Sequence, residues 1–279
     1  MNAVKTFVLL GTLTLLLVVA GDLLGGTPGM MVALGLAVAM NAAAYWWSDR
    51  IVLRMYRARP LDPREVPDLH GMTAELARRA GLPVPRLALI PSEAPNAFAT
   101  GRDPAHAVVA VTTGLLRHLD PEEVRGVLAH EVAHIKHRDI LIASLAAVLA
   151  GAIGMLAAVA RFSFLLGGHR DREGGGNPIA MLAMLIVMPL AALFVQMAIS
   201  RSREYHADEA AARLIGSPRP LIGALRRLGV AARRVPMAAN PATAHLFIVN
   251  PLQGGGLLSL FSTHPPLERR VARLEALGQ

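Results

Sequence analysis

His130, Glu131 and His134 belong to the sequence His-Glu-Val-Ala-His, whose spacing suits metal chemistry. On a helix, residues four apart lie on one face, so the two imidazoles can bind one metal ion while Glu131 reaches a bound water. Zinc held by three protein ligands keeps a fourth position for water and lowers the pKa of that water to about 7. A neighbouring carboxylate can accept the released proton, and Glu131 is the predicted general base of a hydrolytic site.

The residues before this motif predict the helix that carries it. Asp120 is suited to the N-cap, Pro121 to the first helical position, and two glutamates follow in the first turn. No glycine or proline occurs between residues 127 and 142. We therefore expect the helix to continue through the motif, which then lies near its middle.

A second helix with an acidic face is predicted over residues 200–214, closing at Gly216. Glu204 and Asp208 are four residues apart on one face of this helix. One carboxylate can bind zinc while the other accepts a proton from the non-ligating nitrogen of a histidine ligand. The alternative is a solvated acidic face without a metal. The upstream His-Glu-Val-Ala-His motif favours the metal site.

The composition is typical of a membrane protein rather than of an ordinary soluble enzyme. Of 279 residues, 53% are hydrophobic, the mean hydropathy is +0.44 and the net charge is +8. The absence of cysteine excludes disulfides and thiolate ligands and leaves histidine, aspartate and glutamate to bind a metal. No RNA- or DNA-binding motif accompanies the positive charge, so we expect a lipid bilayer as partner, with anionic headgroups, and no nucleic acid.

Four apolar stretches approach the roughly 20 residues that cross a bilayer. They form two pairs, residues 4–24 with 30–47 and residues 140–160 with 178–200. The first stretch has an alternative as a cleaved signal peptide, and the second pair has one as buried core helices of a soluble domain. The very short link within the first pair, and the uninterrupted small and aliphatic residues of 140–160, favour two membrane hairpins.

Arginines set the expected orientation and the domain boundaries. They follow the second and fourth stretches, at Arg50, Arg54, Arg57, Arg59, Arg201 and Arg203. By the positive-inside rule these ends and both termini face the cytosol. The expected segments are a transmembrane hairpin (1–49), the first part of a cytosolic protease domain (50–139), a second transmembrane hairpin (140–200) and the second part of that domain (201–279).

Between the hairpins, an amphipathic helix over residues 62–81 precedes three short strands. The strands are predicted at residues 87–90, 97–100 and 107–111, and the proline and glycine turns between them favour a small antiparallel sheet. An exposed edge of this sheet could pair with an extended substrate through backbone hydrogen bonds, and the candidate residues are Asn96, Ala97, Phe98 and Ala99. The alternative is a purely structural hairpin.

Taken together, these parts resemble the HtpX family of membrane zinc metallopeptidases, relatives of the CAAX prenyl endopeptidases. The match covers the hydrophobic pairs, the His-Glu-Val-Ala-His helix and the stretches 96–101, 203–208 and 263–265. It implies a mainly α integral membrane protein with a small β-sheet, in which a gluzincin-like zinc metallopeptidase domain is joined to about four transmembrane helices. It also implies the bacterial cytoplasmic (inner) membrane as location, and polypeptide substrates that are misfolded or damaged membrane proteins.

The resemblance also implies roles for single residues. His130, His134 and Glu204 bind one Zn²⁺ per chain, Glu131 is the catalytic base, and His264 approaches the developing oxyanion. The alternative for His264 is a helix-entry residue, since Pro265 and a final amphipathic helix follow it. One departure is His137, where relatives often carry asparagine.

Spacing separates Glu204 from the other candidates for the third ligand. Asp139, five residues beyond His134, lies about 180° from the expected approach of Glu204 if both sit on one continuous helix. His137 needs a distorted turn, and Glu209 points about 100° away from Asp208. Asp208 has a shorter side chain, better suited to orienting an imidazole. His137 and His206 are expected to be structural or solvated.

Two functions fit these residues. The first is an integral-membrane zinc endopeptidase whose site faces the cytosol. The second is a non-enzymatic membrane scaffold whose zinc joins two helices. An open coordination position distinguishes them, because structural zinc sites are usually closed by four protein ligands. Three strong ligand candidates and a glutamate placed as a base favour catalysis.

Overall fold

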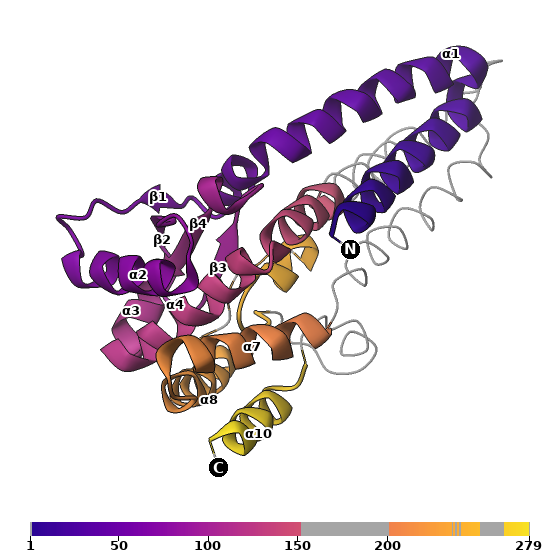
Figure 1. Cartoon of the computed structure of the whole chain (residues 1–279). Coiled ribbons are helices and arrows are strands. Elements are labelled where there is room, and N and C mark those ends of the chain that lie inside the picture. Colours follow the sequence, from indigo (N-terminus) through magenta and orange to yellow (C-terminus); the bar gives the residue numbers. More distant parts are fainter. Residues whose placement is uncertain are drawn as a thin grey trace.

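A helical hairpin and a helical domain built around one small sheet make up the described part of the chain (Figure 1). The computed structural model describes residues 2–151, 201–235, 237, 239, 241–251 and 265–278. The apolar stretch expected at 178–200 and the last part of the stretch at 140–160 lie outside these residues.

The hairpin is the helix α1 (Asn2–Met55), which contains two helices joined by a bend at Gly25 and Gly26. Gly26 has φ 58°, a left-handed backbone that glycine adopts without a steric penalty. Across the two arms, Asn41 Nδ2 donates a hydrogen bond to Thr14 Oγ1 at 2.9 Å. Such polar contacts stabilise helix pairs in an apolar environment.

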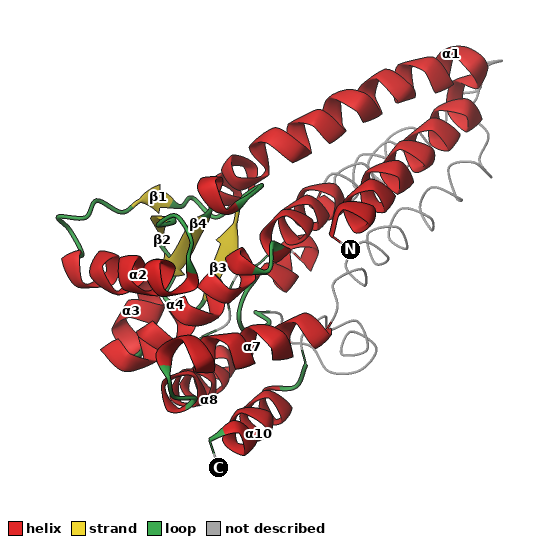
Figure 2. Cartoon of the chain, viewed as in Figure 1, coloured by secondary structure: helices red, strands yellow, loops and turns green. Residues whose placement is uncertain are grey.

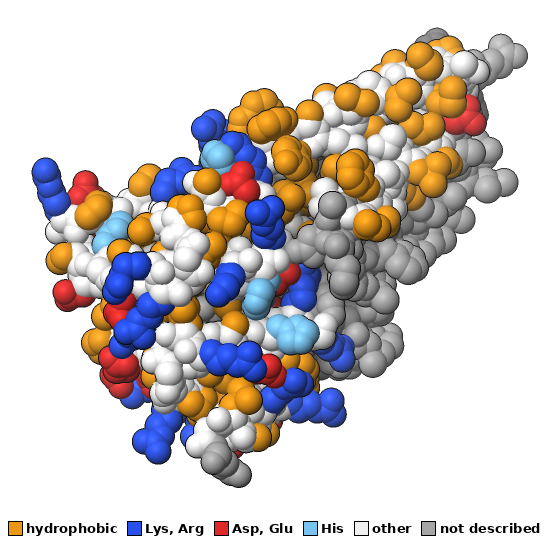
Figure 3. All heavy atoms as spheres, in the orientation of Figure 1, with side chains coloured by type: hydrophobic (Ala, Val, Ile, Leu, Met, Phe, Trp, Pro, Cys, Tyr) orange, Lys and Arg blue, Asp and Glu red, His pale blue; other side chains and the backbone are white. Residues whose placement is uncertain are grey.

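By length and composition, one helix of the described residues could cross a membrane. It is Gly25–Met55, with 31 residues of which a small fraction is buried, and Thr6–Asp22 and Asp139–Gly151 are shorter apolar helices. Hydrophobic side chains cover much of the visible hairpin surface, whereas charged side chains concentrate on the domain (Figure 3). One side of the hairpin is buried, because Leu9, Leu13 and Leu17 share an apolar cluster with Leu145 and Leu149.

The sheet has four strands in the order β1-β2-β4-β3 (Figure 2). The strands are β1 (Arg59–Pro60), β2 (Arg86–Ile90), β3 (Ala97–Thr100) and β4 (Val108–Thr112). β1 pairs antiparallel with β2, β3 pairs antiparallel with β4, and β2 and β4 are parallel. The expectation of an antiparallel sheet is therefore wrong at its centre. β4 folds back on β3 after the short helix η1 (Pro104–His106), and β2 lies on the other side of β4.

The first helix of the domain, α2 (Pro67–Ala80), begins later than predicted. Residues 62–65 form a turn instead, in which the amides of Arg64 and Glu65 donate to Asp62 at 2.8 and 3.0 Å. Pro67 then takes the first helical turn, where its missing N–H costs no hydrogen bond. α2 ends at Gly81, whose φ of 71° closes the helix in the left-handed conformation.

The central helix is α4 (Pro121–Lys136), which contacts α2, α7, α8 and β3. The other elements of the domain are α3 (Thr113–His118), α7 (Arg201–Ile215), α8 (Arg219–Arg234), η2 (Pro241–Leu246) and α10 (Leu267–Leu277). Val127, Leu128 and Ile135 of α4 are fully buried in the main core. This burial fixes α4 in place against α7, its neighbour in the domain (Figure 1).

The beginning of α4 follows the predicted capping pattern. The amide of Asp120 donates to the Glu123 carboxylate at 3.0 Å, as in a capping box. Arg227 of α8 pairs with both carboxylates, at 2.6 Å to Asp120 and 3.0 Å to Glu123. Helix α8 is thereby fastened to the beginning of the motif helix.

The end of α4 differs from the expectation of one continuous helix. α4 stops at Lys136, Arg138 adopts φ 57°, and a new helix begins at Asp139. The motif therefore lies in the last turns of α4. The break directs Asp139 back toward His134 and Arg203, with which it forms ion pairs at 3.3 and 3.4 Å.

Gly126 tests the contact between α4 and α8. A Cβ there would lie 2.7 Å from the Leu221 amide nitrogen and 2.9 Å from the Leu221 Cα. We expect Gly126→Ala to lower the free energy of unfolding by about 1–3 kcal/mol, because helix backbones must separate. The matched control is Gly71→Ala in α2, where nothing lies within 4 Å and alanine should stabilise the helix by up to about 1 kcal/mol. Thermal unfolding in detergent measures both, and equal midpoints would contradict this packing.

Candidate metal centre

The two motif histidines point their Nε2 atoms toward each other on one face of α4. His130 Nε2 and His134 Nε2 are 3.1 Å apart, and the two rings are nearly perpendicular. His130 is almost completely buried, and the side chain of His134 is 16% exposed. The helical spacing of four residues thus produces the convergence expected from the sequence.

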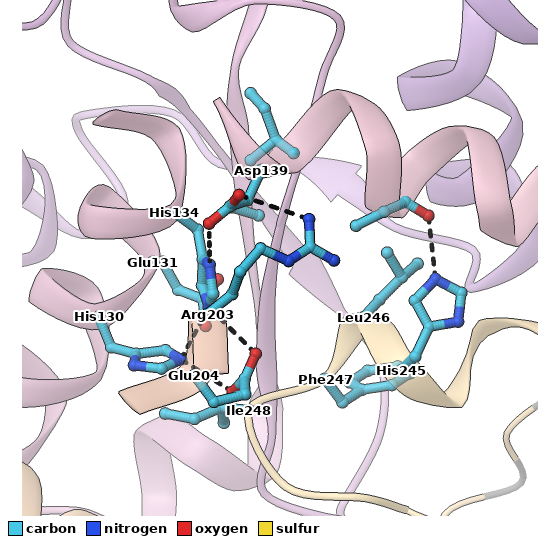
Figure 4. Close-up of a pocket in the computed structure, with 13 residues that line it drawn as sticks. His130, Glu131, His134, Asp139, Arg203, Glu204, His245, Leu246, Phe247 and Ile248 are labelled. Carbon is cyan, nitrogen blue, oxygen red and sulfur yellow. Dashed lines mark hydrogen bonds and ion pairs between the residues drawn. The ribbon is translucent and has the colours of Figure 1, made fainter. Parts of the chain in front are cut away.

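Glu204 joins them from α7, the helix packed on this face of α4 (Figure 4). Its Oε2 lies 3.7 Å from His130 Nε2 and its Oε1 lies 3.5 Å from His134 Nε2. One ligand atom from each of the three residues lies within 4.8 Å of the other two. Glu204 is 6% exposed, so the three groups form a largely buried cluster.

This donor set fits a zinc ion. Two ligand atoms bound to one tetrahedral zinc, each about 2.0–2.1 Å from it, lie about 3.4 Å apart. Here the two Nε2 atoms are 3.1 Å apart, and the Glu204 carboxylate lies 3.5 Å from His134 Nε2 through Oε1 and 3.7 Å from His130 Nε2 through Oε2, all close to that value. Two imidazole nitrogens and one carboxylate are also a ligand combination that zinc accepts in catalytic sites.

Each histidine contacts an aspartate through its other nitrogen. Asp208 Oδ1 lies 3.0 Å from His130 Nδ1, and Asp139 Oδ2 lies 3.3 Å from His134 Nδ1. An acceptor at Nδ1 keeps the imidazole proton on that side and leaves Nε2 available to a metal. The contact of Asp139 with His134 was not expected. On a continuous helix, which turns 100° per residue, Asp139 would point away, but the break after Lys136 changes its direction.

Two arginines pair with these aspartates. Arg203, next to Glu204 in α7, lies 3.4 Å from Asp139 Oδ1. Arg270 of α10 donates to both oxygens of Asp208, at 2.7 and 2.8 Å. Arg270 was not identified from the sequence. A signal existed, since it lies on the apolar side of an amphipathic helix together with Leu267, Val271 and Leu274.

Glu131 lies beside the cluster and is 2% exposed. Burial raises the pKa of its carboxyl group to about 7, partly opposed by the charge of His134 and by a hydrogen bond from the backbone of Ala99. Burial disfavours the charged form of an acid because the surroundings solvate it poorly. A carboxyl group with a pKa near neutrality can both accept and release a proton in one reaction cycle.

The two histidines have opposite electrostatic surroundings. Burial lowers the pKa of His130 to about 4, although the hydrogen bond to Asp208 opposes this shift. Burial also lowers the pKa of His134, but the hydrogen bond to Asp139 and the charges of Glu204 and Glu131 outweigh it and raise the pKa to about 9. A metal ligand must be neutral imidazole, so binding a metal at this cluster releases a proton from His134.

A small pocket lies over the cluster, with space for water of about 30 Å³. Its walls include Ala99 of β3, Arg203, His245 near the end of η2, and Phe247 and Ile248 in the segment that follows η2 (Figure 4). His245 Nε2 contacts the Ala143 carbonyl at 2.9 Å. The volume holds a few water molecules and is too small for an extended peptide.

The edge of β3 is covered, which corrects the expectation of an exposed strand. Asn96 O faces β4, accepting from the Thr112 amide, so Ala97 and Ala99 face outward in the alternating pattern. The amide of Ile248 donates to Ala97 O at 3.0 Å, and Asn96 Nδ2 donates to Val249 O at 2.8 Å. Asn96, Ala97, Phe98 and Ala99 are all buried. Their role in binding substrate stays a prediction that requires this segment to move.

The remaining candidates lie apart from the cluster or outside the described residues. His137 and His206 are exposed. Glu209 pairs with Arg273 at 2.7 Å, on the side of α7 that faces α10. His264 lies outside the described residues, so its role stays a prediction.

Comparisons with known proteins agree with this geometry. The family model Peptidase family M48 matches residues 63–277. The chain is 54% identical to "Protease HtpX homolog" of Desulforapulum autotrophicum, covering 98% of this chain and 89% of that one, and 55% identical to the protein of that name from Persephonella marina, covering 100% and 98%. The relative of that name in Pyrococcus furiosus is 51% identical, covering 99% and 96%.

The fold is also found among solved structures. One example is the crystal structure of S. mikatae Ste24p, with a TM-score of 0.53 and 22% sequence identity. The alignment covers 98% of this chain and 65% of that longer chain. At this identity the similarity concerns the arrangement of elements, and it extends over the hairpin as well as the helical domain.

A graded series of substitutions tests the ligand set. We expect Glu204→Ala to lose stoichiometric zinc, because it removes a ligand. Asp208→Ala and Asp139→Asn should weaken zinc binding by roughly 10- to 100-fold, since they release one imidazole each. His137→Ala and Glu209→Ala are the controls and should bind as the parent does. Competition with a chelator measures all five, and near-normal affinity in Glu204→Ala would remove this residue from the site.

Proposed function

The chain belongs to peptidase family M48, among the HtpX proteases, and from this premise we propose that it is a membrane-embedded zinc endopeptidase with one Zn²⁺ per chain. The observation that carries the proposal is the convergence of His130 Nε2, His134 Nε2 and the Glu204 carboxylate beside a buried Glu131. Three protein ligands leave one position for water, as in catalytic zinc sites.

His130, His134 and Glu204 would hold the ion. When bound, zinc lowers the pKa of a coordinated water and polarises the carbonyl of the scissile peptide bond. Glu131 would accept the proton of the attacking water and deliver it to the leaving amine. Its raised pKa, about 7, suits both transfers near neutral pH. The Ala99 backbone amide, which donates to Glu131, would orient the carboxylate toward the pocket.

His264 is proposed to donate a hydrogen bond to the oxyanion that develops on the attacked carbonyl. Removing a single donor of this kind from an enzyme typically lowers the rate by about 10²- to 10³-fold. The support is the sequence Thr-His-Pro at residues 263–265, shortly before α10. Since α10 brings Arg270 to the cluster, the chain reaches the centre soon after His264.

The alternative function is a non-enzymatic membrane scaffold with a structural zinc. Among the described residues, the group that could hold a metal has three members. The two aspartates beside the cluster, Asp139 and Asp208, lie against the Nδ1 atoms. An open position and a buried base favour the enzyme over the scaffold.

The proposed substrates are polypeptides, in particular misfolded or damaged membrane proteins. An extended segment would pair with the outward backbone groups of Ala97 and Ala99 after Ile248 leaves them. Such pairing recognises the backbone rather than a side-chain sequence, which suits a protease that degrades many proteins. Phe247, which lines the pocket, packs against Tyr56 directly after the hairpin, and this supports substrates that reach the site from the membrane.

We also propose the topology of two transmembrane hairpins, at residues 1–49 and 140–200, and a cytosolic domain formed by residues 50–139 and 201–279. Its support is the exposed apolar surface of the first hairpin and the arginines that follow it. Trp46 and Trp47 are about half exposed at the base of the hairpin, as expected at the headgroup level. The proposed location is the bacterial inner membrane, with both termini in the cytosol.

Glu131→Gln tests the mechanism. The variant should keep zinc, because Glu131 is not a ligand, and should lose at least about 100-fold in cleavage of an unfolded model protein in detergent. The matched control is Glu122→Gln, an exposed glutamate in the first turn of the same helix. Chelator should abolish cleavage by the parent. If Glu131→Gln cleaves at the parent rate, the proposed base is wrong and the scaffold gains support.

Single cysteines test the topology, since the chain has none of its own. Val84→Cys lies on an exposed loop of the domain and should be protected from a membrane-impermeant thiol reagent in intact cells. Gly175→Cys, between the third and fourth apolar stretches, should be labelled. Labelling of both after the cells are opened controls for reactivity. The reverse pattern would contradict the cytosolic orientation.

A further inference from the structure

Arg270 is a fully buried arginine next to the metal centre that neither the proposed ligand set nor the proposed base includes. It is 0% exposed and comes from α10, the last helix of the chain. A buried guanidinium is costly unless all of its surroundings compensate its charge. The groups that surround Arg270 therefore indicate why it is there.

Three hydrogen bonds of 2.7–2.8 Å occupy the guanidinium. Nε donates to Asp208 Oδ2 at 2.8 Å and Nη2 to Asp208 Oδ1 at 2.7 Å, which is a bidentate pair. Nη1 donates to the Ile248 carbonyl at 2.7 Å and lies 3.6 Å from Glu204 Oε2. Arg270 thus contacts Asp208 and Glu204 of α7, and it also contacts Ile248 in the segment that covers β3.

The bidentate pair decides which atom His130 meets. Asp208 Oδ1 lies 3.0 Å from His130 Nδ1, whereas Arg270 Nη2 lies 3.5 Å from the same nitrogen. The carboxylate is therefore the nearer partner, and His130 donates its Nδ1 proton to it. Because both oxygens are held by one planar group, the carboxylate cannot rotate away from the imidazole.

We propose that Arg270 is a positioning residue of the metal centre: it fixes the Asp208 carboxylate so that His130 presents Nε2 to the metal. This inference rests on the proposed zinc site. Positioning through the Asp208 carboxylate differs from general packing. It affects the metal only while Asp208 can accept the Nδ1 proton of His130. The C-terminal helix would thereby complete a site whose ligands lie in α4 and α7.

Arg270→Lys is the main test, because lysine keeps the charge and loses the bidentate geometry. We expect its zinc affinity, measured by competition with a chelator, to fall about 10-fold. The absorption spectrum of bound Co²⁺ should change with it, since the orientation of one ligand changes. In the Asp208→Asn background the same substitution should change affinity by less than about twofold, because the two residues act in one chain of contacts.

Arg273→Lys is the matched control. Arg273 lies one turn away on α10, pairs with Glu209 of α7 at 2.7 Å and stacks over Tyr205, so it makes the same kind of contact between the same helices. Its zinc affinity and cobalt spectrum should equal those of the parent. If folded Arg270→Lys has the zinc affinity and cobalt spectrum of the parent, the inference is overturned. It is also overturned if Arg270→Lys lowers zinc affinity as much in the Asp208→Asn background as in the parent.

A paired variant covers the case in which Arg270→Lys does not fold. Asp208→Asn with Arg270→Gln contains neither buried charge and is compared with Asp208→Asn alone. Equal affinities are expected, and a further 10-fold loss overturns the inference. These measurements need no proteolysis and therefore test the inference separately from the proposed mechanism. If the parent binds zinc and Glu131→Gln still cleaves, only the proposed mechanism is contradicted. A parent that binds no metal overturns both.

Discussion

The packing of α7 against α4 is the contact on which the metal centre depends. Ala207 and Ala211 of α7 are completely buried, and α7 packs closely against α4. At this separation a glutamate reaches both Nε2 atoms, within 3.7 Å, and an aspartate one turn later reaches His130 Nδ1. One interface therefore supplies both the third ligand and the group that orients the first.

Burial of charge is the second constraint. Glu131, Asp139, Glu204 and Asp208 are all buried within one small region. Carboxylates removed from water require cations or donors nearby. Asp208 has Arg270 from α10, and Asp139 has Arg203 from α7. The two aspartates in turn contact the two histidines. Each of the two histidines is thus connected to an arginine through one carboxylate, and the charges of the centre are distributed over four separate elements of the chain.

The hairpin, β3 and the segment that covers β3 form one packed unit. Tyr56, directly after the hairpin, packs against Phe98 and Phe247 with ring centroids 5.9 and 5.1 Å apart, and its hydroxyl contacts Thr243. Phe98 and Phe247 lie 5.2 Å from each other. Aromatic contacts of this kind stabilise a cluster beyond the area they bury. Displacement of Ile248 from the strand edge therefore also disturbs contacts at the base of the hairpin.

Local patterns in the sequence determined much of this protein: the capped start of α4, the convergence of His130 and His134, the glycine ends of α2 and α7, the short link of the first hairpin and the three predicted strands to within a residue. Each depends on neighbours a few positions away. The resemblance to the HtpX family, which the comparisons confirm, predicted that the protein is a membrane peptidase. Only the tertiary structure decided that β2 and β4 are parallel, that Asp139 turns back to His134, that Arg270 joins Asp208, and that Ile248 covers β3. These contacts join residues whose proximity depends on how whole helices pack, and no local period encodes that packing.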